Sequence, residues 1–138
     1  MKRLFLAVPL ALLSLGSSLA LAETPQPKET ALSKQYAACM EKAAATVDML
    51  DCMAAEETLQ DARLNTMYKD LMKKLPKERA EKLKEAQRAW IKFRDAHAMY
   101  LSSGEGTAAG LVGSDWMVTS TAERATQLAN ELDMVNEQ

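Results

Sequence analysis

Residues 76–101, PKERAEKLKEAQRAWIKFRDAHAMYL, decide the fold of this 138-residue chain. Pro76 suits the first turn of a helix, because a residue there has no intrahelical partner for an N–H. Apolar and aromatic residues then recur at intervals of three and four, which is typical of one helix face. They are Leu83, Ala86, Trp90, Phe93, His97 and Leu101. The segment therefore predicts a long helix that packs this face against other helices.

Two more helices are predicted before this segment. Thr46 occupies a good N-cap position for a long helix that ends near Lys74. That helix carries a clear apolar seam, formed by Leu64, Tyr68, Leu71 and Leu75. A shorter helix is expected over 31–45, with an apolar face of Leu32, Tyr36, Met40 and Ala43.

After the deciding segment, four of the five glycines fall within 102–113, which predicts a loop. Ser114 or Asp115 is expected to cap a fourth helix. Its register is given by Met117, Thr121, Arg124, Leu128 and Val135. Because short connections make neighbouring helices antiparallel, we predict an all-α fold. It is a small antiparallel up-and-down bundle of about four helices, dominated by the hairpin of the second and third.

The N-terminus predicts a cleavable secretory signal peptide over residues 1–22. A basic start is followed by an apolar stretch over 4–15 and the small-x-small site Ala20-Leu21-Ala22. An uncleaved membrane anchor is the alternative, because residues 4–22 approach the length of a span. The small residues and the cleavage site favour cleavage after Ala22. We therefore expect a periplasmic or secreted protein without a membrane anchor. A disordered Pro-rich leader over 23–30 and one helical domain over 31–138 would follow.

The charge of the chain argues against a nucleic-acid partner, and its two cysteines predict a disulfide. Loss of the signal peptide would change the net charge from −2 to about −4. Nucleic-acid binding rests on a basic surface, so the acidic balance argues against it. In an oxidising compartment, Cys39 and Cys52 are expected to form a disulfide.

The sequence contains no recognisable catalytic or metal-binding motif. His97 is the single histidine, and its place on the apolar face suggests a core or boundary residue. Glu56 and Glu57 lie on a charged helix, where a solvated face is the simplest interpretation. We therefore predict no catalytic residues, no metal site and no cofactor.

Polar residues on the apolar seams are the more informative candidates. Asp61 and Asn65 flank Leu64, and Gln87 and Arg94 share one side of a helix with Trp90. Burial of a guanidinium is costly without an acceptor, so Asp61 is a candidate partner for Arg94 or for Arg124. These residues form either a buried inter-helix network or an open polar pocket.

From Cys39 to Leu128 the chain resembles the LprI-like lysozyme inhibitor family of small exported bacterial proteins. The resemblance is carried by Leu64-Asn65-x-x-Tyr68 and by Gln87-x-x-Trp90-x-x-x-Arg94-Asp95, with Thr121-x-x-Arg124 downstream. The polar seam residues and these motifs together define the candidate binding residues, namely Asp61, Asn65, Tyr68, Gln87, Trp90, Arg94 and Arg124. Family members commonly carry a second cysteine pair, at the positions of Ala98 and Trp116 here. We expect Trp116 to pack over Ala98 in place of that bridge.

The resemblance implies a protein partner, such as a basic lysozyme, that an acidic exported domain would bind and inhibit. Animal lysozymes cleave with two carboxylates in a cleft, so an inhibitor needs only to cover that cleft. The glycine-rich loop is one candidate for insertion, and a plain connector is the alternative. A periplasmic protein-interaction or envelope-homeostasis module without lysozyme activity is the second functional hypothesis. A hydrolase that uses residues such as Asp61 and Arg94 in an open pocket is the third.

Overall fold

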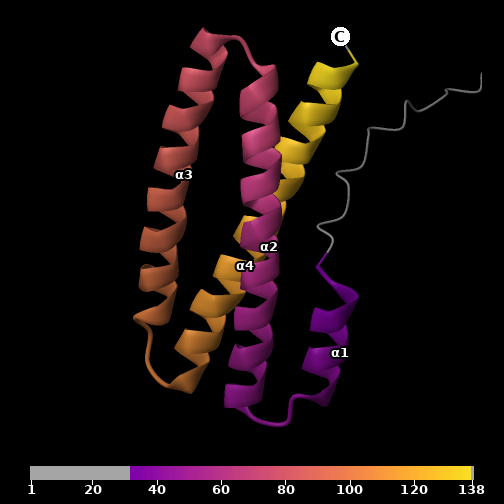
Figure 1. Cartoon of the computed structure of the whole chain (residues 1–138). Coiled ribbons are helices and arrows are strands. Elements are labelled where there is room, and N and C mark those ends of the chain that lie inside the picture. The colour runs from indigo at the N-terminus through magenta and orange to yellow at the C-terminus, as the bar shows by residue number, and fades with distance from the viewer. Residues whose placement is uncertain (1–31, 138) are drawn as a thin grey trace, which may run out of the picture.

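The computed structural model describes residues 32–137, and in this part of the chain it contains four helices and no strand. They are α1 (Lys34–Lys42), α2 (Thr46–Lys74), α3 (Lys77–Ser102) and α4 (Thr107–Asn136). Each helix runs opposite to the one before it (Figure 1). The predicted all-α up-and-down bundle is confirmed. The predicted signal peptide and leader lie outside the described residues.

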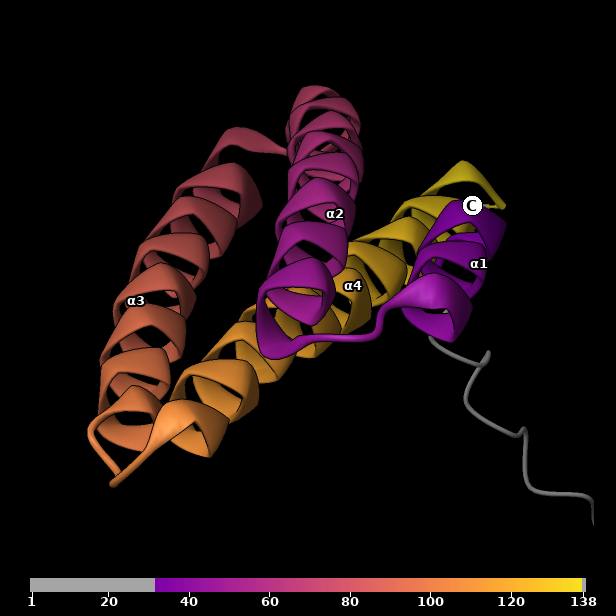
Figure 2. The same cartoon turned by 90° about the horizontal axis from the view of Figure 1, so that it is seen from below.

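Helix α4 is the element on which the two other long helices pack. A tight turn at Leu75 and Pro76 joins α2 to α3, yet each of them lies closer along its backbone to α4 than to the other. Figure 2 shows α2 and α3 standing apart, with α4 running diagonally from beside the end of α3 and passing behind α2. Small residues on α4, including the fully buried Ala122 and Ala125, allow this close approach of α2.

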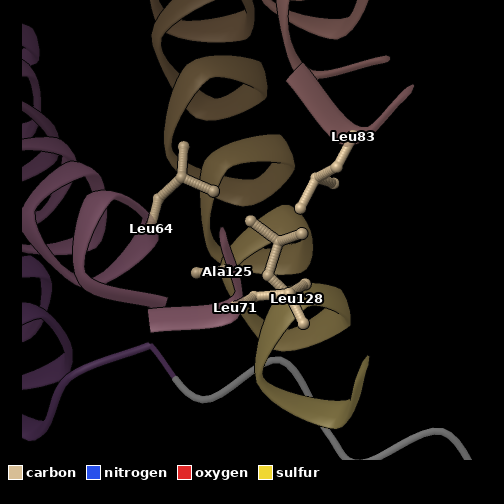
Figure 3. Packing of buried hydrophobic residues seen from close by; sticks show 5 residues of the cluster. All are labelled: Leu64, Leu71, Leu83, Ala125 and Leu128. Carbon is tan, nitrogen blue, oxygen red and sulfur yellow. The ribbon is translucent and has the colours of Figure 1, made fainter. Parts of the chain in front are cut away.

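The hydrophobic core lies where the three long helices meet (Figure 3). Its buried members come from all three helices, and they are Leu64, Leu71, Leu83, Ala125 and Leu128. Burial of each leucine side chain contributes about 1.5–3 kcal/mol relative to exposure. The predicted seam of α2 is confirmed, with Tyr68 and Leu75 partly buried beside it.

The first helix is shorter than expected and differs in its caps. α1 begins at Lys34, because the hydroxyl of Ser33 accepts from the N–H of Tyr36 at 3.0 Å and caps the helix. The prediction that Thr46 caps α2 is wrong, since Thr46 is already helical. The carboxylate of Asp48 instead accepts from the N–H groups of Ala44 and Ala45, at 3.1 and 2.9 Å.

The predicted glycine-rich loop over 102–113 is also wrong in extent, as is the cap at Ser114 or Asp115. The connection covers only 103–106, and α4 begins at Thr107. Gly106 has a φ of 78°, a left-handed conformation that favours glycine. Gly113 lies inside α4, where a Cβ would come within 3.0 Å of the main-chain oxygen of Ala98. A side chain would not fit at Gly113, because α3 passes too close.

A disulfide joins α1 to α2. Cys39 and Cys52 are bonded, with their Cα atoms 5.7 Å apart. Cys52 is 4% exposed, whereas Cys39 lies on the exposed side of α1. The bond therefore fastens a helix that has no fully buried residue to the rest of the bundle.

Candidate functional site

A cleft of about 270 Å³ opens between α2 and α3. It exists because the two helices pack on α4 rather than on each other. Five of the seven candidate binding residues line it, namely Asp61, Asn65, Tyr68, Gln87 and Arg94. The i, i+3, i+4 spacing along each helix turns these side chains toward the same opening. The two structural alternatives are both represented, because the five residues line an open cleft while Gln87 and Arg94 are also hydrogen-bonded to side chains of α4.

Arg94 lies at one end of the cleft with its side chain 12% exposed. Its guanidinium contacts Asp95 at 2.8 Å and donates to the hydroxyl of Thr121 on α4 at 3.2 Å. It also lies over the ring of Trp90, 5.1 Å from the ring centroid. Trp90 does not line the cleft but supports it from the core side, where it packs against the buried cluster.

The predicted pairing of Asp61 with Arg94 or Arg124 is wrong. Asp61 accepts from the side-chain amide of Asn65 one helical turn away, at 2.8 Å. Arg124, which lies outside the cleft, donates from Nε to Oε1 of Gln87 at 3.0 Å. The acceptors of both arginines therefore lie on α3 or α4, and none of them lies on α2. Asp61 remains on the exposed rim of α2.

A second polar network, which the sequence interpretation missed, links α1, α2 and α4. Glu56 is 3% exposed, so the expectation of a solvated carboxylate is wrong. It accepts from the N–H of Ser33 at 2.8 Å, from the Ser33 hydroxyl at 2.5 Å, and from Nε2 of Gln60 at 2.7 Å. Burial alone would favour the neutral acid. The hydrogen bonds from Gln60 and Ser33 outweigh it and lower the pKa of Glu56 below its ordinary value of 4.5.

Arg63 extends this network to α4. Its guanidinium donates to Oε1 of Gln60 at 3.2 Å and to the hydroxyl of Thr126 at 3.0 Å. Helical spacing could have predicted the burial of these side chains, because Glu56 and Gln60 lie between Met53 and Leu64 on the buried face of α2. The charge of Glu56 led instead to the prediction of an exposed residue.

An aromatic face covers the other side of α3. We use this name for Phe93, His97, Tyr100 and Trp116. The Trp116 ring lies 4.4 Å from His97 and 5.9 Å from Phe93, and His97 lies 5.7 Å from Tyr100. Phe93, which was predicted to face the core, is 56% exposed, and Tyr100 is 69% exposed. His97 is half-buried, as expected for a boundary residue. The packing of Trp116 over Ala98 stays a prediction, since the contacts of its ring described above are with Phe93 and His97.

The same end of the bundle is acidic. Residues 46–62 hold five carboxylates, residues 95–123 hold four, and neither segment contains a lysine or arginine. Figure 1 shows that α2 begins, α3 ends and α4 begins at this end. The burial of Tyr36 and the negative charges of Asp115 and Glu56 raise the pKa of Tyr36 above 10.0. Exposed aromatic side chains and a surplus of negative charge therefore occur together here.

Comparison with known families identifies the chain. A family model described as "Lysozyme inhibitor LprI" matches residues 39–128. The chain belongs to the LprI lysozyme inhibitor family. This match covers the last four residues of α1, all of α2 and α3, and α4 as far as Leu128. Searches of curated proteins and of solved structures found no match.

Two further observations describe what residues 32–137 contain. None of their helices is both long and apolar enough to cross a membrane. Nor do three or more histidine, cysteine, aspartate or glutamate side chains gather in this region into a group that could hold a metal ion.

Proposed function

We propose that this protein is exported and inhibits lysozyme by binding it. The match to the LprI lysozyme inhibitor family carries the proposal, because it names the class of partner. A disulfide between Cys39 and Cys52 suits an oxidising compartment outside the cytoplasm. The predicted signal peptide over 1–22 agrees with this location. An inhibitor acts by occlusion and requires no catalytic residues, so we assign none.

The acidic end of the bundle is the surface that suits this partner. Lysozymes of the animal type are strongly basic, and complementary charge speeds the encounter of two proteins. Exposed aromatic side chains supply the energetic centre of many interfaces. Phe93 and Tyr100 are exposed at this end. Tyr100 belongs to the segment 95–123, which has no lysine or arginine, whereas Phe93 stands between Lys92 and Arg94. We therefore infer that lysozyme contacts the aromatic face, with the surrounding carboxylates guiding its approach.

The test measures lysis of a bacterial cell-wall suspension by hen egg-white lysozyme in the presence of the purified protein. We expect inhibition at micromolar concentration, and weaker inhibition as salt screens the charges. The double variant Phe93→Ala/Tyr100→Ala should raise the inhibitory concentration at least tenfold, as loss of central aromatic residues does at other interfaces.

Met134→Ala is the matched control, since Met134 is 55% exposed near the opposite end of α4. It should inhibit like the unmodified protein. Full inhibition by the double variant would contradict the assigned surface, although lysozyme would remain the partner. No inhibition by the unmodified protein would remove lysozyme and leave the second hypothesis, a protein-interaction module with another envelope partner.

A further inference from the structure

Three basic side chains line the cleft between α2 and α3. Lys84, Arg88 and Arg94 line it, against the single lining carboxylate of Asp61. Asp95 pairs with Arg94 at 2.8 Å, and Glu81 pairs with Lys84 at 3.5 Å, so each of these two cations has a carboxylate beside it. Arg88 is the third lining cation, and within residues 32–137 it is in no ion pair. An anionic group that enters the cleft would therefore pair with Arg88.

Two of the lining groups have hydrogen-bond donors to offer. Within residues 32–137, Arg88 forms no hydrogen bond or ion pair, and its side chain is exposed. Gln87 accepts from Arg124 through Oε1, and its Nε2 donates to no acceptor among the same residues. No side-chain polar atom that is fully buried in this region lacks a partner, so Nε2 is accessible to solvent. Arg124 thereby holds an oriented amide donor at the cleft.

The α2 wall offers a complementary acceptor and an apolar surface. The amide of Asn65 donates to Asp61, which leaves its carbonyl oxygen available at the cleft. Leu64 lines the α2 side, and Ile91 faces it from α3 with 39% of its surface exposed. The lining therefore combines donors for an anion, an acceptor for one N–H group and space for a small apolar side chain.

We propose that this cleft binds the C-terminal residue of a short peptide. Arg88 and Gln87 donate to the terminal carboxylate, Asn65 accepts from the peptide N–H, and the side chain lies against Leu64 and Ile91. A carboxylate accepts two parallel hydrogen bonds from a guanidinium, which makes Arg88 the principal contact. The volume of about 270 Å³ accommodates one or two small residues. This site is separate from the aromatic face, and the proposal does not depend on lysozyme inhibition.

The experiment is a titration of the purified protein, followed by calorimetry and by NMR shifts of side-chain amide signals. The probe is N-acetyl-alanyl-alanine, and its C-terminal amide is the uncharged counterpart. We expect saturable binding of the acid, a shift of the Gln87 amide signal, and at least tenfold weaker binding of the amide. Arg88→Gln should weaken binding of the acid at least tenfold, because a charge-assisted hydrogen bond is lost.

Arg79→Gln is the matched control, an exposed arginine on α3 that does not line the cleft. It should bind the acid like the unmodified protein, and both variants should keep the unmodified melting temperature. Equal binding of acid and amide, or binding unaffected by Arg88→Gln, would overturn the carboxylate assignment. Tighter, Arg88-dependent binding of inorganic phosphate would also overturn it, in favour of a phosphate site. Absence of binding at millimolar acid would overturn the proposal as a whole.

Discussion

The indole N–H of Trp116 on α4 donates to the main-chain oxygen of Arg94 on α3 at 3.0 Å. The same ring packs against His97 and Phe93, so one side chain joins the two helices by a hydrogen bond and by aromatic contact. The family resemblance places half of a second cysteine pair at position 116. In this chain a noncovalent contact connects α3 and α4 there.

Trp116→Ala should lower the free energy of unfolding by about 3 kcal/mol, because truncation of a packed tryptophan leaves a cavity. Trp116→Phe keeps an aromatic ring but not the donor, and it should cost about 1 kcal/mol. Urea unfolding monitored by circular dichroism measures both changes. A near-neutral alanine variant would show that the ring contributes nothing to the joining of the helices.

Glu56→Gln should destabilise the protein at neutral pH by about 2 kcal/mol, since one of its donors then faces an amide N–H₂ instead of a carboxylate. Glu57→Gln is the control and should lie within about 0.5 kcal/mol of the unmodified protein. The folded-state pKa of Glu56 lies below its ordinary value of 4.5. Its contribution is therefore present above that value and is lost as the pH falls through the folded-state pKa. The melting temperatures of the unmodified protein and of Glu56→Gln should therefore converge toward acid pH. A difference in melting temperature that stays constant with pH would contradict the assigned ionisation of Glu56.

Replacement of Cys39 and Cys52 by alanine should lower stability by up to about 3 kcal/mol, the chain-entropy value for a short loop. The separation of 13 positions confines the effect to α1 and the start of α2. Hydrogen exchange should show amides of α1 losing protection while the centres of α3 and α4 keep theirs. Uniform loss of protection along the chain would mean that α1 is needed by the whole bundle.

Two glycines of α4 provide a matched pair. At Gly110 a Cβ would meet nothing within 4 Å, so Gly110→Ala should stabilise the helix by about 0.5–1 kcal/mol. At Gly113 the Cβ would collide with the side chain of Ser102 and press on the main chain of Ala98. Gly113→Ala should therefore cost about 1–3 kcal/mol despite the better helix propensity. Thermal unfolding of the two variants should shift in opposite directions, and a shared direction would refute the close approach of α3.

The sequence was informative where periodicity and burial agree. Leu64, Leu71 and Leu128 were predicted on apolar seams, and all three are buried. Glu56 lies in the same periodic row as these leucines, but its charge led to the prediction of an exposed side chain. The structure shows it buried, with Ser33 donating hydrogen bonds to its carboxylate. Such donors come from 23 residues away, and no local pattern indicates them.

The start of α4 and the pairing of the arginines were missed for a related reason. Glycines weaken a helix locally, which favoured a loop, whereas Gly113 lies inside α4 at a point where α3 leaves no room for a side chain. Arg94 finds Thr121 because α3 packs on α4, whereas a hairpin closed along its length would have brought it to Asp61. Five of the cleft residues were nevertheless named from sequence, since helical spacing placed them on facing rows.

The diagonal position of α4 has a consequence for how this fold can change. Because α2 and α3 each rest on α4, the residues that face each other across the cleft lie largely outside the hydrophobic interior. Asp61, Asn65 and Arg88 are exposed, and substitutions there leave the leucine cluster untouched. Natural variation along these two rows can therefore alter what the cleft recognises at little cost in stability, so relatives could diverge in ligand while they retain one scaffold.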